Sequence, residues 1–324
     1  MKEFVINKND AGQRLDRFTS KTVPLLPTSL TQKYIRIKRI KVNGKAAKRD
    51  YKLFLGDTVQ MYVNDEFFEV PNDGNAYLAV NNPALDIVYE DDNIMLLNKP
   101  VGVLCHSAGE YVHGSLVARV QSYMHQTGQW RPKDENSFAP ALCNRIDRNT
   151  SGIVIAAKNA QALRIINEKI KDQEIDKYYL AVVHGRPSPA SGRLEGHIFK
   201  DAVKNRVYVT KNSQPGSKQA VMEYKTISAS KKGNVKTAPL TLLECRLLTG
   251  RTHQIRAQLA DIGHPLLGDS KYGSKRLDKQ FGEEKQALCS YKLLFSFKTD
   301  AGPLSYLNGQ EFTLQNIPFV KKYF

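Results

Sequence analysis

The segment NRIDRNTSG, residues 144–152, places one aspartate between two arginines, an arrangement that could form a reactive site. Asp147 follows Arg145 by two residues and directly precedes Arg148, and Gly152 permits a tight turn into the apolar run IVIAA. A carboxylate held near a guanidinium stays ionised, so Asp147 could act as a nucleophile or as a general base. The alternative is a structural ion pair at the entrance of a strand, and the pattern taken alone favours that alternative.

A second segment, DKYYLAVVHG at residues 176–185, has the composition of a strand. Lys177, Tyr179 and Ala181 would share one face of it, because side chains alternate along a strand. A tyrosine beside a site could stack on a nucleic-acid base and still offer its hydroxyl group. Most strand tyrosines only pack in a core or on a sheet, so this segment by itself is weak evidence for a site.

A third segment, TGRTHQIR at residues 249–256, gathers polar groups at the start of a predicted helix. Arg251, His253 and Arg256 lie within six residues of one another. A helix start with guanidinium groups can bind an anion, either an RNA phosphate or a buried carboxylate. The alternative is a solvated basic helix, but three glycines and a proline between residues 263 and 273 interrupt the chain too densely for that.

The elements that must position these segments indicate a large sheet. From residue 86 onward, short alternating runs typical of strands recur, and helical patterns are sparser. The clearest helix covers residues 159–172, where Asn159 can cap the helix and Leu163 and Ile166 share one side. We therefore expect an α+β fold with a large mixed, mostly antiparallel sheet and a few flanking helices.

The N-terminal part of the chain is small and strongly basic. The whole chain has 48 Lys and Arg against 32 Asp and Glu, a net charge of +16. Residues 33–52 contain nine basic residues and one acidic residue, so this stretch supplies +8, half of the total. Two short helices, over residues 14–21 and 28–37, and a hairpin at Asn43-Gly44 would make a compact module that follows phosphates. The candidate RNA contacts there are Lys33, Arg36, Arg39 and Lys41.

Several classes of protein lack support in the sequence. There is no apolar stretch long enough to span a membrane and no apolar signal core near the start. The four cysteines are scattered without a C-x-x-C pair, which favours a reduced, cytoplasmic setting. Sequence motifs for nucleotides, dinucleotides and zinc are missing, so we expect no cofactor and no metal. A monomer is the default expectation.

Taken together, NRIDRNTSG, KYYLAVVHG and LLTGRTHQIR closely resemble, in this order and spacing, the signature of the RluA-type pseudouridine synthases. The run VYEDDNIMLLNKPVGV extends the resemblance over residues 86–324. Residues 10–65, with the VNG hairpin and a later Gly-Asp turn, resemble an S4-type RNA-binding domain. The resemblance implies an S4-like domain over residues 1–70, a linker over 71–85 and a catalytic domain with the pseudouridine synthase fold over 86–324.

The resemblance also implies roles for single residues. Asp147 matches the catalytic aspartate of the family, Tyr179 the tyrosine that packs against the target base, and Arg256 the arginine that pairs with the catalytic carboxylate. The positions expected to contact RNA on the rim of the site are Arg145, Arg148, Arg251 and His253. The chain departs from the usual pattern at Asn144, Gln258 and Cys289-Ser290, none of which is an implied reacting group.

The implied activity is the isomerisation of specific uridines to pseudouridine in RNA, above all in bacterial 23S ribosomal RNA, because an S4 domain precedes the catalytic domain in family members that modify it. Asp147 would either attack C1′ of the sugar or remove a sugar proton, and the sequence does not separate these routes. Two alternatives stay open. One is a non-catalytic S4-domain RNA-binding or ribosome-assembly factor. The other is a glycoside hydrolase acting on nucleosides, although such enzymes usually need two carboxylates.

Overall fold

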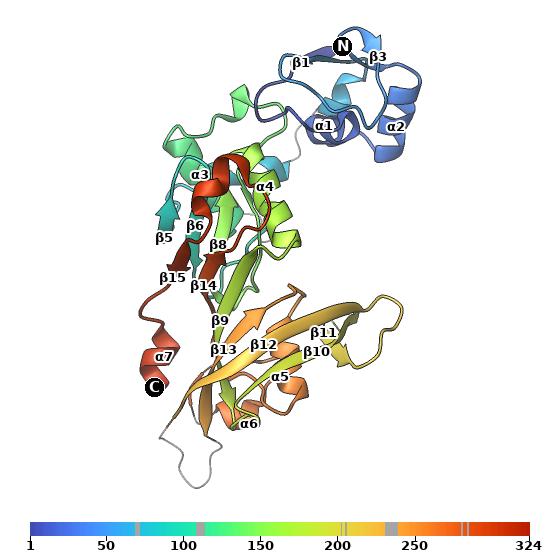
Figure 1. Cartoon of the computed structure of the whole chain (residues 1–324). Coiled ribbons are helices and arrows are strands. Elements are labelled where there is room, and N and C mark those ends of the chain that lie inside the picture. Colours follow the sequence, from blue (N-terminus) through green and yellow to red (C-terminus); the bar gives the residue numbers. More distant parts are fainter. Residues whose placement is uncertain are drawn as a thin grey trace.

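The computed structural model describes residues 1–68, 72–107, 114–201, 203–204, 206–230, 239–279, 281–283 and 285–324. Two units, each with its own sheet, follow one another along the chain (Figure 1). The small N-terminal unit lies at one end of the molecule, and the sheet of the large unit extends away from it.

The small unit is a four-stranded antiparallel sheet with two helices. Its strands are β1 (Lys2–Val5), β2 (Ile40–Val42), β3 (Lys45–Ala46) and β4 (Thr58–Met61), and its helices are α1 (Leu15–Thr22) and α2 (Thr28–Arg36). The sheet order is β1-β4-β2-β3. Leu15 and Phe18 are fully buried on one face of α1, as their spacing predicts. The predicted hairpin joins β2 to β3, with positive φ angles at Asn43 (50°) and Gly44 (73°).

The segment predicted as a linker, residues 71–85, packs against the large unit over much of its length. Residue 71 and the preceding domain boundary at residue 70 lie outside the described residues. Two 3₁₀ helices, η1 (Asp65–Phe68) and η2 (Asn72–Ala79), flank that gap. Tyr77 meets the ring of Trp130 edge-on at 5.1 Å, and the carbonyl of Val80 accepts a 2.6 Å bond from the Ser122 hydroxyl. This segment is therefore an anchored connection.

The large unit is built on an eleven-stranded sheet, counted over the described residues. The path β11-β10-β12-β13-β9-β14-β8-β6-β5 is extended by β15, which pairs with β14, and by β7, which pairs with β8. The strands are β5 (Ile87–Glu90), β6 (Ile94–Lys99), β7 (Ala141–Leu142), β8 (Ser151–Ala157), β9 (Ile175–His184), β10 (Ser191–Asp201), β11 (Arg206–Thr210), β12 (Lys218–Ala229), β13 (Leu240–Leu247), β14 (Leu288–Phe295) and β15 (Glu311–Thr313). The pairing of β14 with β8 is parallel, and the other pairings are antiparallel. The predicted mixed, mostly antiparallel sheet is confirmed.

Short helices flank this sheet. They are α3 (Leu116–Gln126), η3 (Pro132–Asp134), α4 (Ala160–Lys171), α5 (Gln254–Asp261), α6 (Lys275–Asp278), η4 (Gly302–Leu307) and α7 (Pro318–Tyr323). The predicted cap of α4 is confirmed, because Asn159 Oδ1 accepts a 2.8 Å bond from the Ala162 amide. Ile166 is fully buried and Leu163 packs beside it. Within the described part of the chain, every helix is too short or too polar to cross a membrane.

A polar interface joins the two units. Both carboxylate oxygens of the fully buried Asp10 accept bonds from the large unit, from the Ser137 hydroxyl (2.5 Å) and from the Asn136 amide (2.7 Å). Beside them, Asn9 Nδ2 donates a 2.6 Å bond to Glu135. Because the buried carboxylate is satisfied mainly across the interface, the contact favours one defined arrangement of the two units.

Candidate active site

One pocket of about 270 Å³ brings the three predicted segments together. The loop before β8 contributes Asp147, β9 contributes Tyr179, and the start of α5 contributes Arg256. Also on the wall are Asn144, Arg145, Ile146, Lys177, Arg251, His253 and Gln254. Positions more than a hundred residues apart in the sequence therefore share one cavity, which is the geometry that a site composed of these residues requires.

The Asp147 carboxylate is paired with Arg256. Arg256 Nη1 donates a 2.9 Å bond to Asp147 Oδ2. The other edge of the guanidinium is bound by Asp269, with Nε to Oδ2 at 2.7 Å and Nη2 to Oδ1 at 2.9 Å. The Asp147 side chain remains 25% exposed, whereas that of Arg256 is only 8% exposed and that of Asp269 is fully buried. Asp147 is thus the carboxylate of this cluster that a molecule in the pocket could reach.

Electrostatics keep Arg256 and Asp269 of this cluster ionised. Burial alone would lower the pKa of Arg256, but hydrogen bonding and charge attraction, first from Asp269 and then from Asp147, raise it above its ordinary value. Burial would likewise raise the pKa of Asp269, yet the bonds from Arg256 and from the backbone amides of Lys271 and Tyr272 lower it. Arg256 therefore stays cationic where it meets the Asp147 carboxylate.

His253 stands beside the same carboxylate. Its Nε2 lies 3.9 Å from Asp147 Oδ2, and its Nδ1 lies 3.0 Å from the Tyr272 hydroxyl. That hydroxyl already accepts a 2.9 Å bond from the Val207 amide, so it can give its own proton to Nδ1. The tautomer this favours has its proton on Nε2, facing Asp147. Burial is the main cause that lowers the pKa of His253 to about 4, so the ring is neutral near pH 7.

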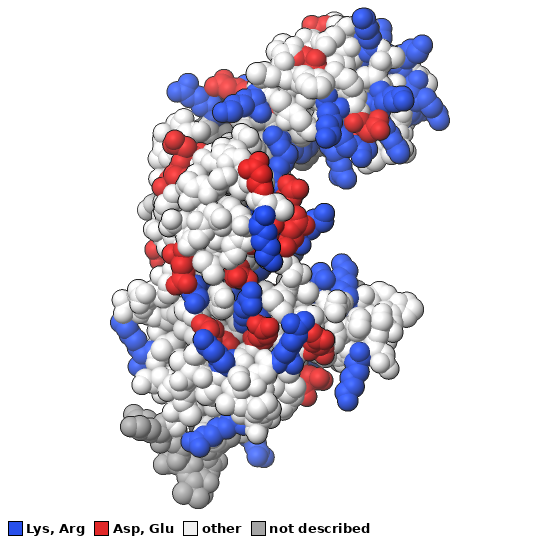
Figure 2. Space-filling view, viewed as in Figure 1, with Lys and Arg blue, Asp and Glu red and all other residues white. Residues whose placement is uncertain are grey.

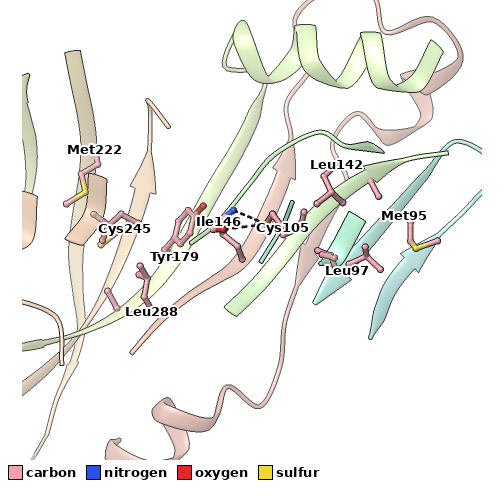
Figure 3. Packing of buried hydrophobic residues seen from close by; sticks show 14 of the residues in the cluster. Met95, Leu97, Cys105, Leu142, Ile146, Tyr179, Met222, Cys245 and Leu288 are labelled. Atoms are coloured by element: carbon pink, nitrogen blue, oxygen red, sulfur yellow. Dashed lines mark hydrogen bonds between the residues drawn. The ribbon is translucent and has the colours of Figure 1, made fainter. Parts of the chain in front are cut away.

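Tyr179 forms an apolar wall of the pocket. It is almost completely buried in β9, and burial is the main cause that raises the pKa of its hydroxyl, which therefore stays protonated. Figure 3 shows its ring in the core beside Ile146, whose amide and carbonyl both contact the Cys105 thiol, at 3.5 and 3.4 Å. Cys105 thus anchors the backbone one residue before Asp147.

The other predicted contacts are distributed over three places. Arg145 and Arg251 are exposed on the rim of the pocket, and Arg251 is steadied by a 2.8 Å bond from its Nε to the Gln219 carbonyl. Arg148 does not line the pocket, because its Nε donates to the Gly102 carbonyl at 3.0 Å. The basic residues predicted in the small unit lie on α2, on β2 or between these elements, away from the pocket: Lys33, Arg36, Arg39 and Lys41. Figure 2 shows many Lys and Arg side chains over this unit.

Sequence reasoning missed two buried charges that support the site. Asp269 follows a glycine in a turn-rich stretch of sequence, and its role becomes visible only in the structure, where it binds Arg256. Lys99 is fully buried at the end of β6, and its Nζ donates to the carbonyls of Pro100, Val103 and Arg148 at 2.9, 2.9 and 3.1 Å. Burial lowers its pKa to about 8. The sequence feature that could have indicated this role is a lysine at the end of an apolar strand, because such a lysine must find hydrogen-bond acceptors, here including a carbonyl of the Asp147 loop.

Two of the three departures from the family pattern, Asn144 and Gln258, have hydrogen-bond partners on the backbone. Asn144 Oδ1 accepts a 2.8 Å bond from the Ile155 amide, and Gln258 Nε2 donates to the carbonyls of Leu194 and Ala220, each at 3.3 Å. Cys289 and Ser290 are buried in β14. In the described part of the chain, no group of three or more His, Cys, Asp or Glu residues is arranged to hold a metal ion.

Comparison with known proteins agrees with this geometry. The sequence model of the RNA pseudouridylate synthase family matches residues 93–261, which include all three segments around the pocket. Among solved structures, the human RNA pseudouridylate synthase domain containing 4 aligns with a TM-score of 0.54 at 20% identity, over 76% of this chain and 93% of that chain. The fold of the large unit is therefore that of the pseudouridylate synthases.

Curated relatives extend over most of the chain. An uncharacterized RNA pseudouridine synthase of Mycoplasma capricolum is 32% identical over 96% of both chains. Ribosomal large subunit pseudouridine synthase C is 31% identical in Vibrio cholerae, over 90% of this chain and 87% of the relative, and 30% identical in Escherichia coli, over 87% and 83%. With the matched family model and the pocket built on Asp147, these relatives show that the chain belongs to the RNA pseudouridylate synthase family, as an RluA-type enzyme that isomerises uridine in RNA.

Proposed function

We propose that this enzyme converts specific uridines of bacterial large-subunit ribosomal RNA to pseudouridine, with Asp147 as the reacting carboxylate. The observation that carries the assignment of Asp147 is its 2.9 Å pairing with Arg256 in a pocket walled by Tyr179. The choice of ribosomal RNA is supported by the names of the relatives in Vibrio cholerae and Escherichia coli.

The pocket residues would divide the reaction as follows. The bond between uracil N1 and the sugar C1′ breaks and a bond between C5 and C1′ forms; C5 gives up its proton and N1 takes up one, so the product is an isomer of uridine. Asp147 either attacks C1′ or removes a sugar proton, and in both routes Arg256 holds its carboxylate in place through the 2.9 Å bond. Tyr179 confines the detached base while it turns. The target nucleotide must first leave its stack, which costs a few kcal/mol that phosphate contacts elsewhere can offset.

We further propose that residues 1–70 act as an S4-like RNA-binding domain and that the protein works as a monomer. The four-stranded sheet with two helices and the exposed cations at Lys33, Arg36 and Arg39 support a unit that holds RNA by its phosphates. Lys41 Nζ lies 5.5 Å from the centre of the Tyr62 ring, so a base stacking there would meet a cation as well.

The test is pseudouridine mapping in ribosomal RNA from cells that lack the protein and carry either wild type or Asp147→Asn. We expect wild type to restore the missing sites and the variant to lose activity by about 10³-fold, because its amide can neither attack nor accept a proton. Asp261→Asn, an exposed change on the same α5 helix, serves as the control and should restore every site. Full restoration by Asp147→Asn would instead support a non-catalytic assembly factor, and free uracil released from RNA would support a glycoside hydrolase.

A further inference from the structure

Three cations, two from the small unit and one from the large unit, lie near the junction of the units. Arg17 and Lys21 are four residues apart on α1, so they lie on the same face of that helix. On α4, Arg164 lies four residues after Ala160 and shares its face in the same way. All three residues keep solvent-exposed surface that a ligand could reach, although the interface partly covers Lys21.

Hydrogen bonds hold the start of α4 and the Lys21 side chain at the interface between the two units. The Ala160 amide donates a 3.1 Å bond to Asn9 Oδ1, which holds the start of α4 against the small unit. From the other side, Lys21 Nζ donates a 2.8 Å bond to Gln13 Oε1, and Gln13 Nε2 donates a 2.9 Å bond to the Ser137 hydroxyl of the large unit. Lys21 is thus tied to the interface through a single intervening side chain.

The cations are close enough to act on one another. Partial burial is the main cause that lowers the pKa of Lys21; the nearby Asp10 opposes this shift, whereas Arg164 and Arg17 add to it. None of the three cations forms an ion pair with a described acidic residue. Asp10, the carboxylate whose charge acts on Lys21, is fully buried and bonded to Asn136 and Ser137. An anion that reaches the junction would therefore meet three cations that form no ion pair with a described residue.

We propose that Arg17, Lys21 and Arg164 form a phosphate-binding site that bridges the two units and holds the backbone of the RNA substrate. The inference rests on the proposed function only in taking RNA as the ligand. Cations from both units are needed, so the site exists only while the units are docked. Figure 2 shows the molecule curved around a hollow with the small unit at one end, and RNA bound at the junction would continue from that unit toward the rest of this curve.

The test measures binding of a large-subunit ribosomal RNA transcript across a salt series. All variants carry Asp147→Asn, so that turnover does not affect the affinity. We expect Arg164→Gln to weaken binding by ~5-fold near physiological salt and to reduce the slope of log affinity against log salt by about one, because one fewer counterion is released. Lys321→Gln removes the same charge from α7 and should leave both quantities unchanged.

A second comparison asks whether the cations share one phosphate. Lys21→Gln should also weaken binding, and the double variant with Arg164→Gln should lose less than the product of the two single losses. Equal slopes for Arg164→Gln and the Lys321→Gln control, or independent losses in the double variant, would overturn the bridging site. Pseudouridine formation is measured in a separate assay with the protein that keeps the native Asp147. If it is absent while the Arg164 effect persists, the proposed function fails and the phosphate site stands.

Discussion

At the scale of single residues, the site depends on how Arg256 distributes its hydrogen bonds. A guanidinium has a fixed, planar set of donors, so binding two of its nitrogens determines where the third points. Asp269 binds Nε and Nη2, and Nη1 is left to meet Asp147. Asp269 is therefore a positioning residue: it does not line the pocket, and it affects Asp147 only by orienting Arg256.

Replacing Asp269 by Asn tests this role. The amide oxygen can still accept bonds from the backbone amides of Lys271 and Tyr272, but the bidentate pair with Arg256 is lost. We expect kcat to fall by about 10- to 100-fold with little change in KM, because RNA binding does not use Asp269 whereas the orientation of Asp147 does. Steady-state kinetics, with thermal melting to verify folding, provide the measurement. A raised KM at unchanged kcat would mean that Asp269 serves binding instead.

The sequence motifs identified Asp147, Tyr179 and Arg256 as residues that could share a site, but they gave no indication of the charged residues behind the pocket. Asp147, Tyr179 and Arg256 belong to short, specific motifs, and the structure places all three in one cavity. Asp269 and Lys99 carry charges into the interior, where their partners are a guanidinium from another element and three backbone carbonyls. Such partners come from tertiary packing, which no local pattern contains.

At the scale of elements, the parallel contact between β8 and β14 holds the Asp147 loop. Ser290 pairs with Gly152, directly after that loop. Gly152 has a φ of +117°, and a Cβ there would overlap the backbone of Ser290. Glycine at this position therefore allows the two strands to approach, and their approach brings the loop next to the strand that pairs with β9.

Adding one methyl group at Gly152 should separate these strands. We expect Gly152→Ala to lower the free energy of unfolding by about 3 kcal/mol or more, since strain at positive φ adds to a backbone collision. Gly128→Ala is the matched control: its φ is +71°, but no atom lies within 4 Å of the added Cβ. This control should lose about 1 kcal/mol. Urea unfolding of both variants gives the comparison, and equal losses would show that φ alone, without the collision, limits position 152.

Strands and helices could be predicted from the sequence where buried residues recur with the periodicity of the strand or helix itself. Alternation predicted the mostly antiparallel sheet, and Asn159 marked the start of α4. Residues 71–85 were different, because their turn-forming composition indicated only a linker. Their attachment comes from Tyr77 against Trp130 and from Val80 against α3, contacts that are distant in sequence.

At the scale of the whole molecule, the arrangement of the two units rests on amides, hydroxyls and carboxylates. The residue types at this interface are those of ordinary surface loops, so the sequence offers no sign that two units dock there. The residues are Asn9, Asp10, Glu135, Asn136 and Ser137. Polar contacts of this kind stabilise a geometry strongly only when every partner is satisfied. The arrangement should therefore be sensitive to the loss of one partner.

Asn136→Ala tests whether this interface controls RNA binding. The change removes the bonds from Asn136 to Asp10 and to the Val5 carbonyl, at 2.7 and 2.8 Å. It should make the free energy of docking between the two units less favourable by about 1–3 kcal/mol. We expect faster amide hydrogen exchange at residues 7–13 and at the start of α4, while the core strands keep their protection. Asn212→Ala, an exposed change after β11, should alter neither region.

The consequence for RNA follows from the same loss. Once the units separate, Arg164 is no longer held near the cations of the small unit, so Arg164→Gln should weaken binding less in the Asn136→Ala background than in the native one. Salt-dependent binding of the four proteins measures this coupling. An undiminished Arg164 effect, with hydrogen exchange confirming that the interface has opened, would mean that α4 contacts RNA without help from the small unit. A diminished effect would show that docking assembles the surface on which the RNA lies.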